Sequence, residues 1–173
     1  MRFKIGDFVS KPVTGVCEIE DIVSLDLTEK KENKLYYLMH SMEDMQGKIY
    51  VPVSNTASRL RLCLTKEEAW NLIERITEIP IAWTNNEKMR EQKYKEAVKS
   101  NDPEALVAII KMIYQRKQQR LAQGKRCTAT DERDFRTAEN LLYMELGTAL
   151  GKPKEKICEM IIEYIDKSRC VSG

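Results

Sequence analysis

The sequence lacks the groups on which most catalytic and metal sites depend. Its 173 residues include a single histidine, His40, and no C-x-x-C pair, which argues against a zinc site of ordinary ligand spacing. The phosphate-binding, dinucleotide-binding and nucleophile-elbow motifs G-x-x-x-x-G-K-S/T, G-x-G-x-x-G and G-x-S-x-G are also missing. A nucleophilic pairing of His40 with a cysteine stays open, but no motif supports it. We therefore expect no enzymatic activity, no metal and no cofactor.

Long apolar runs are also missing. No segment approaches the roughly 18 residues of a membrane span, and the opening "MRFKIGDF" meets charge too early for a secretory signal. The five cysteines are odd in number and scattered, which is typical of reduced, mostly buried thiols. We expect a cytoplasmic protein that does not contact the membrane.

Acidic residues are absent from one stretch of the chain. The formal net charge is only +2, yet residues 105–130 contain six basic residues and no acid. A local basic patch can bind polyanions without causing nonspecific binding by the rest of the protein. The alternative is a solvated helix face. The basic residues of this stretch are Lys111, Arg116, Lys117, Arg120, Lys125 and Arg126.

The first 64 residues have the pattern of a β domain. Short runs rich in β-branched and aromatic residues alternate with turns, and residues 28–33 and 43–47 are expected as a charged loop and a turn. In "KIYVPV", Ile49 and Val51 alternate with more polar neighbours, and Pro52 cannot donate a ladder hydrogen bond. This run should therefore lie at a sheet edge or end at Pro52. Five short strands in about 60 residues predict a small SH3- or Tudor-like barrel.

From Thr65 the apolar period becomes helical, so the predicted fold class is α+β, with a domain over 1–64 and an all-helical domain over 65–173. "TKEE" is a capping box that opens the first helix, whose core face is expected to include Trp70. Asp102 and Pro103 have the N-cap and first-turn pattern of a third helix. The expected helices span about 65–77, 85–99, 103–123, 130–150 and 154 onward.

Trp83 stands at the junction before the second helix. Thr84 and Glu87 have capping-box spacing, which predicts a helix start at Thr84 and places the indole one residue outside it. A staple onto the fourth helical residue is a weak explanation, because that residue is Lys88. Packing in the core and an exposed functional role both stay open.

The order of these segments resembles the CarD/CdnL family of bacterial transcription regulators. The resemblance rests on "FKIGDFVSKPVTGVCEI", "YYL", "YVPVSN" and "RLR", then Trp83 before a basic helix, "KSND", "YQRK" and "AENLLYMEL". The β domain is also similar to the polymerase-binding domain of transcription-repair coupling factors, although this chain has no ATPase motifs. The resemblance implies a Tudor-like domain that binds the β subunit of RNA polymerase and a helical domain that contacts promoter DNA.

In the family, the tryptophan wedges into the minor groove at the upstream edge of the bubble and helps to hold the open complex; here that residue is Trp83. An indole can wedge at a distorted base step while lysine and arginine hold phosphates. The DNA contact is expected to be largely independent of base sequence. The protein is expected to be a monomer associated with the nucleoid. The expected DNA-binding residues are Trp83, Lys88, Arg90, Lys93, Arg116, Lys117, Arg120 and Arg133.

The chain departs from the family pattern where arginines would grip polymerase. The stretch "SLDL" lacks one such arginine, and Tyr50 replaces another. Polymerase binding should therefore depend more on strand addition and apolar contacts. The expected polymerase-binding residues are Lys48, Ile49, Tyr50, Val51 and Pro52. A separate departure concerns the DNA contact, because Glu132-Arg133 stands where some members have a Lys-Arg pair. An alternative function is a protein-interaction scaffold that makes no direct DNA contact.

Overall fold

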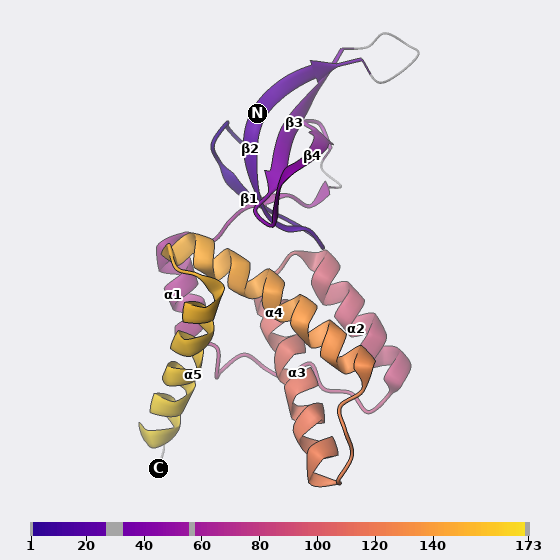
Figure 1. The fold of residues 1–173 in the computed structure, drawn as a ribbon, viewed down its shortest axis with the longest axis vertical. Helices are drawn as coiled ribbons and strands as arrows, with labels where there is room; N and C mark the ends of the chain where they lie inside the picture. Colours follow the sequence, from indigo (N-terminus) through magenta and orange to yellow (C-terminus); the bar gives the residue numbers. More distant parts are fainter. Residues whose placement is uncertain (1, 27–32, 56–57, 172–173) are drawn as a thin grey trace. The chain divides into compact units, whose positions relative to one another are not determined.

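The computed structural model describes residues 2–26, 33–55 and 58–171. It divides into two compact units, Met1–Cys63 and Leu64–Gly173, each with its own core (Figure 1). The boundary expected from the sequence lies one residue further along the chain. Apart from Asn33, the charged loop expected at residues 28–33 lies outside the described residues.

The first unit is a five-stranded antiparallel sheet with the strand order β4-β3-β2-β1-β5. Together with the helices that follow, it confirms the predicted α+β class, and it places "KIYVPV" on an edge strand as expected. The longest strand, β2, is visibly bent in Figure 1. The strands are β1 (Phe8–Lys11), β2 (Gly15–Leu25), β3 (Lys34–Ser41), β4 (Asp44–Pro52) and β5 (Arg61–Leu62).

Alternation of side chains along the strands builds the core of this unit. Residues two apart point to the same face of a strand, and Tyr37 and Met39 of β3 are both buried in the cluster that also contains Val51. The turn expected at residues 43–47 is wrong, because the chain reverses at Met42 and Glu43 and β4 has already begun at Asp44.

The Asp44 carboxylate explains why that stretch resembles a turn. It accepts hydrogen bonds from the backbone N–H groups of Gln46 and Gly47, at 3.2 and 3.0 Å. Aspartate and glycine are common in turns for this kind of local bonding, which here takes place within the first residues of a strand.

Within the part of the second unit that the structure describes there are five helices, as predicted. Thr65 caps α1 in a capping box with Glu68, and Asp102 caps α3 with Pro103 in the first turn. Gly151 ends α4 in the left-handed conformation that glycine adopts without strain. The helices are α1 (Lys66–Glu74), α2 (Glu87–Ser100), α3 (Pro103–Ala122), α4 (Ala129–Leu150) and α5 (Lys154–Val171).

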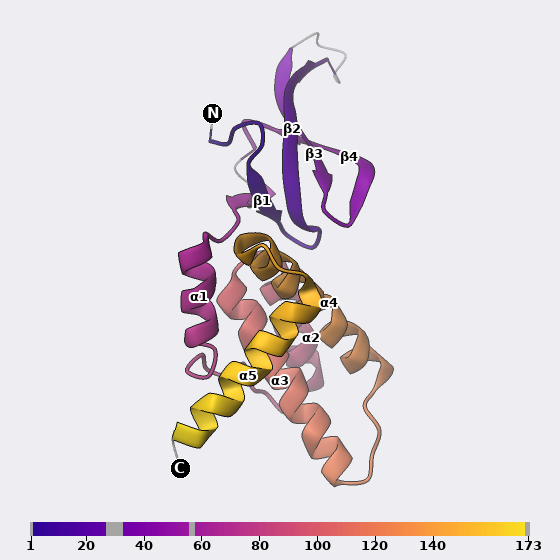
Figure 2. The same ribbon diagram turned by 60° about the vertical axis from the view of Figure 1, so that its left-hand side comes forward.

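The helical core is built around α4, which packs against α1, α3 and α5, while α2 packs against α3 (Figures 1 and 2). Glu145 of α4 is only 2% exposed, and its carboxylate accepts a hydrogen bond of 2.9 Å from the Leu64 N–H at the entrance to the unit. In the part of the chain that the structure describes, no helix is both long enough and apolar enough to cross a membrane.

Two predictions around the tryptophans are wrong. Trp70 is 38% exposed, because α1 buries Ala69, Leu72 and Ile73 instead. The start of α2 is also displaced, since Asn86 is its N-cap and accepts a hydrogen bond from the Met89 N–H. Asparagine is a stronger N-cap than threonine. The Thr84 hydroxyl instead accepts a bond from the Asn86 N–H, so Trp83 lies three residues before the cap.

Candidate polymerase and nucleic-acid interfaces

The edge strand β4 has one side of its backbone paired and one side open among the described residues. It pairs with β3 alone, in a register that sets Tyr37 opposite Val51 and Met39 opposite Ile49. The Val53 N–H bonds to the Leu35 carbonyl at 2.9 Å. Backbone N–H groups point alternately to the two sides of a strand in an antiparallel ladder. This bond therefore establishes which N–H groups of β4 point away from β3.

The same alternation directs the Ile49 and Val51 N–H groups toward β3 and those of Lys48 and Tyr50 away from the sheet. Pro52 has no N–H and occupies the next outward position, where none is needed for pairing with β3. Tyr50 is 43% exposed and Lys48 is exposed, whereas Val51 is buried and Ile49 and Pro52 are half-buried. The five expected polymerase-binding residues therefore form one segment with outward donors at Lys48 and Tyr50.

Arg90 and Arg116, expected as phosphate contacts, belong to an ion cluster inside the helical unit. Arg116 Nε lies 2.7 Å from the Asp131 Oδ2, and both side chains are largely buried. Arg90 donates to the Asn85 carbonyl, and its pKa is lowered first by burial and then by the Arg116 charge, against the pull of Asp131. The Asp131 carboxylate pairs with Arg116 and attracts the charge of Arg90, so this cluster links α2, α3 and α4.

Four further basic side chains also have partners in the helical unit. Lys93 donates to the Trp83 carbonyl at 3.4 Å, and Arg120 donates to the Arg126 carbonyl at 2.9 Å. Arg133 pairs with Asp134 at 3.2 Å but is 73% exposed, so its other donors face solvent. Lys111, from the acid-free stretch, donates to three backbone carbonyls. A basic residue in the sequence is therefore not necessarily a free cation in the fold.

Other basic side chains make no side-chain hydrogen bond or ion pair with the described residues. Lys88, Lys125 and Arg126 are of this kind, and all three are exposed. Lys117 is half-buried near Glu139. Burial raises the pKa of the Glu139 carboxyl, and the Tyr143 hydrogen bond and the Lys117 charge oppose that rise. Of the basic residues on α2 and in the acid-free stretch, these four side chains make no side-chain hydrogen bond or ion pair with the described residues.

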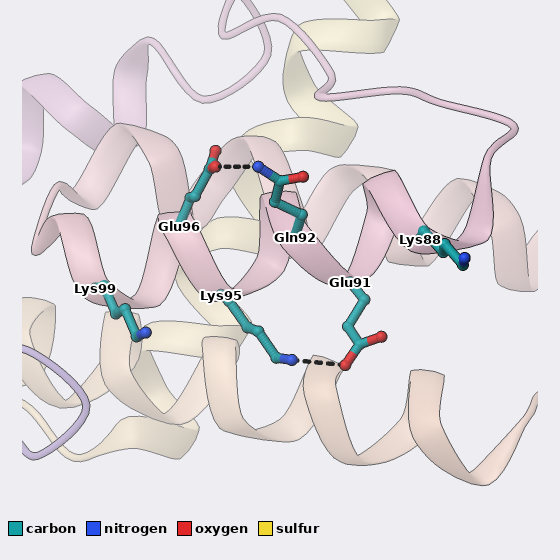
Figure 3. Close-up of a pocket in the computed structure, with 6 residues that line it drawn as sticks. All are labelled: Lys88, Glu91, Gln92, Lys95, Glu96 and Lys99. Carbon is teal, nitrogen blue, oxygen red and sulfur yellow. Dashed lines mark hydrogen bonds and ion pairs between the residues drawn. The ribbon is translucent and has the colours of Figure 1, made fainter.

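The outer face of α2 carries a shallow concavity with mixed charge (Figure 3). Lys95 pairs with Glu91 at 2.7 Å and Gln92 bonds to Glu96 at 2.8 Å, which leaves Lys88 at one end of the row. Such pairs are typical of a solvated helix face. The lining residues are Lys88, Glu91, Gln92, Lys95, Glu96 and Lys99.

Trp83 is half-buried and packs against the helical core cluster. The sequence left core packing and exposure as alternatives, and the structure places the indole between them, with one part against the core and the rest accessible. A role as a wedge in DNA would use the accessible part.

His40 lies on β3 between two carboxylates of β2. Its Nδ1 is 2.7 Å from Glu20 and its Nε2 is 3.7 Å from Glu18.

All five cysteines are free, but only Cys17 is fully buried, which corrects the expectation of mostly buried thiols. Burial raises the pKa of the Cys17 thiol to about 11, so it is not a thiolate at neutral pH. Within the described ranges, no group of three or more potential ligand side chains could hold a metal ion.

The β unit, with its open edge strand, is similar to a known class of polymerase-binding domain. Residues 3–62 match the family model described as the CarD-like/TRCF RID domain, which confirms the resemblance for this part of the chain. Domains of this family interact with the β subunit of RNA polymerase, so the protein is an RNA polymerase-interacting, transcription-related protein. No curated protein matches the chain.

Proposed function

We propose that the protein is a transcription regulator that binds the RNA polymerase β subunit through its first unit and promoter DNA through its second. The polymerase contact would form by addition of a strand to the open edge of β4, with Tyr50 supplying apolar contact. The match to the RID domain family is the observation that carries this assignment. The protein would act without catalysis, as a cytoplasmic monomer.

The DNA contact would lie at the upstream edge of the transcription bubble and stabilise the open complex. Support comes from the resemblance, from the half-accessible Trp83, and from the exposed cations Lys88, Lys125 and Arg126. Arg90, Arg116 and Arg120 are engaged within the fold, so they would contribute less to phosphate binding than their charge suggests. The contact would be weak and largely independent of sequence.

The engaged arginines also support a second candidate, a scaffold that bridges proteins and makes no DNA contact. Duplex binding by the full chain as a function of salt separates the two. If about three phosphates are neutralised, log affinity should fall against log salt with a slope of about −2.7, since each contact contributes about 0.9. Lys125→Ala should reduce that slope by about 0.9, whereas Glu132→Ala, its charge-opposite control near the same loop, should not reduce it. Affinity that does not depend on salt would favour the scaffold.

A further inference from the structure

The segment that carries Trp83 has no helix or strand of its own. Residues 80–84, between α1 and α2, follow a turn that ends α1. Its carbonyls therefore have no helical donors, and in such segments side chains or water must supply the missing hydrogen bonds. Which groups bind this backbone determines how Trp83 is held.

Lys111 of α3 binds the carbonyls of the turn that leads into this segment. Its Nζ donates to the carbonyl oxygens of Ile76, Thr77 and Ile79, at 3.0, 3.3 and 2.6 Å. An ammonium group has three donors, and all three are used here. A cation at the carbonyl end of a helix is also favoured by the helix dipole. Burial lowers the pKa of Lys111, which fits an ammonium that has exchanged water for carbonyl oxygens.

Two more bonds fix the end of the segment at the tryptophan. The Ala82 N–H donates to the Ala108 carbonyl at 3.4 Å, and Ala108 lies one turn before Lys111 on the same face of α3. Lys93 of α2 donates to the carbonyl of Trp83 itself at 3.4 Å. Backbone on both sides of the buried Ile79 is thus bound by two lysines from two helices.

We propose that Lys111 and Lys93 are positioning residues for Trp83 rather than phosphate contacts. They hold the backbone of residues 76–83 so that the indole packs on the core with one part and presents the other part to a partner. The consequence for forked DNA depends on the proposed function, whereas the positioning of Trp83 does not.

The test uses the full chain with Trp70→Phe, so that Trp83 is the single tryptophan, excited at a wavelength where tyrosine does not absorb. Lys111→Met keeps the apolar stem and removes the donors, and Lys111→Arg restores donors. Lys125→Met removes an exposed cation that makes no side-chain hydrogen bond or ion pair with the described residues. Acrylamide quenching of Trp83 should increase in Lys111→Met, return toward the parent value in Lys111→Arg, and stay unchanged in Lys125→Met. Lys93→Met, which removes one bond only, should show a smaller increase.

DNA binding supplies the second measurement. The parent protein should prefer a forked to an intact duplex by about 5- to 150-fold, which corresponds to a stack of about 1–3 kcal/mol. Lys111→Met should lose this preference. It should leave unchanged the slope of log affinity against log salt on intact duplex. Lys125→Met should lower that slope by about 0.9 and keep the fork preference. Trp83→Ala combined with Lys111→Met should lose no more preference than either change alone, because both act through the indole.

Two results would overturn the positioning role. The first is that acrylamide quenching of Trp83 stays unchanged in both Lys111→Met and Lys93→Met. The second is that Lys111→Met lowers the slope of log duplex affinity against log salt as much as Lys125→Met does. If Lys111→Met does not fold, Lys93→Met and Lys111→Arg decide through the same quenching measurement. If quenching changes as expected while the parent protein shows no fork preference, the positioning role stands and the proposed wedge function fails.

Discussion

At the scale of single residues, the Cys17 thiol makes stability depend on pH. Burial raises its pKa to about 11, with Lys11 opposing the effect, while in the unfolded chain a thiol titrates near pH 8.5. A group whose pKa is raised by folding stabilises the fold fully at pH values below its pKa in the unfolded chain. That stabilisation is lost as the pH rises through its pKa in the folded chain. The loss should therefore occur between about pH 8.5 and 11 and approach roughly 3 kcal/mol.

Urea unfolding of the wild type and of Cys17→Ala at pH 7, 9 and 11 measures this loss. Cys17→Ala should be less stable at pH 7, because it leaves a small cavity, yet its stability should fall less toward pH 11. Lysines and tyrosines titrate in both proteins, so their effect cancels in the comparison. Parallel pH profiles would show that the thiol does not contribute.

Trp83 should affect both stability and DNA binding, because it is half-buried. Trp83→Ala should cost about 1–3 kcal/mol of unfolding free energy, between the roughly 0.5 kcal/mol of a surface change and the 3–5 kcal/mol of a core tryptophan. It should also weaken binding to forked DNA by about 1–3 kcal/mol and leave polymerase binding unchanged. Trp70→Ala is the matched control, since Trp70 lies outside the core cluster. A fork defect of equal size in the control would argue against a specific role for Trp83.

Residue types and their charges were predictable from the sequence, but their partners were not. The stretch 105–130 contains no acid, yet the acid that pairs with Arg116 is Asp131, the first residue after it. The turn between α3 and α4 brings these side chains together, and no local pattern encodes that contact. Lys111 is a similar case, because its acceptors lie 32 to 35 residues earlier in the chain.

At the scale of elements, the open edge of β4 can be tested by removing one outward donor. Tyr50→Pro removes the N–H that points away from β3 and restricts Ile49 to extended backbone, which a strand already has. Losing one main-chain hydrogen bond of about 1–1.5 kcal/mol should weaken polymerase binding about tenfold. Ile49→Pro is a poorer test, because it breaks the ladder within the sheet.

Tyr50→Ala is the control, since it removes the ring and keeps the N–H. It should weaken binding through lost apolar contact, and Tyr50→Pro should weaken it further. Binding to the isolated β subunit can be measured by calorimetry, with circular dichroism to establish that both variants fold. Equal affinity of the two variants would exclude a main-chain contact at this position.

Elements with a complete local signal were predictable from the sequence. The capping box at Thr65, the Asp102-Pro103 start and the Gly151 end all use side chains within a few residues of the helix terminus. The start of α2 was misplaced because Thr84 and Asn86 both have N-cap chemistry, and the sequence pattern did not rank them. The start of β4 was missed because Asp44 and Gly47 serve a strand while resembling a turn.

At the scale of the whole molecule, the two units would bind two different partners that meet at one promoter. Linking two weak contacts in one chain raises the effective concentration of the second once the first has formed. The β-unit variant Tyr50→Pro and the helical-unit variant Lys125→Ala should therefore each weaken promoter association, by different routes. Only the second should change its dependence on salt.

The hydrogen bond between Leu64 and Glu145 predicts where the chain can be divided into stable pieces. The family model ends at residue 62, and the sequence alone suggested a cut after residue 64. A helical piece that starts at Thr65 lacks both the N–H that bonds to the buried Glu145 carboxylate and the Leu64 side chain packed on the core. A piece that starts at Leu64 retains both. Since a hydrogen bond to a charged group contributes about 1.5–3 kcal/mol, urea unfolding should show the 64–173 piece to be more stable than the 65–173 piece by at least that amount. Equal stability of the two pieces would mean that the bond holds the linker without supporting the helical core.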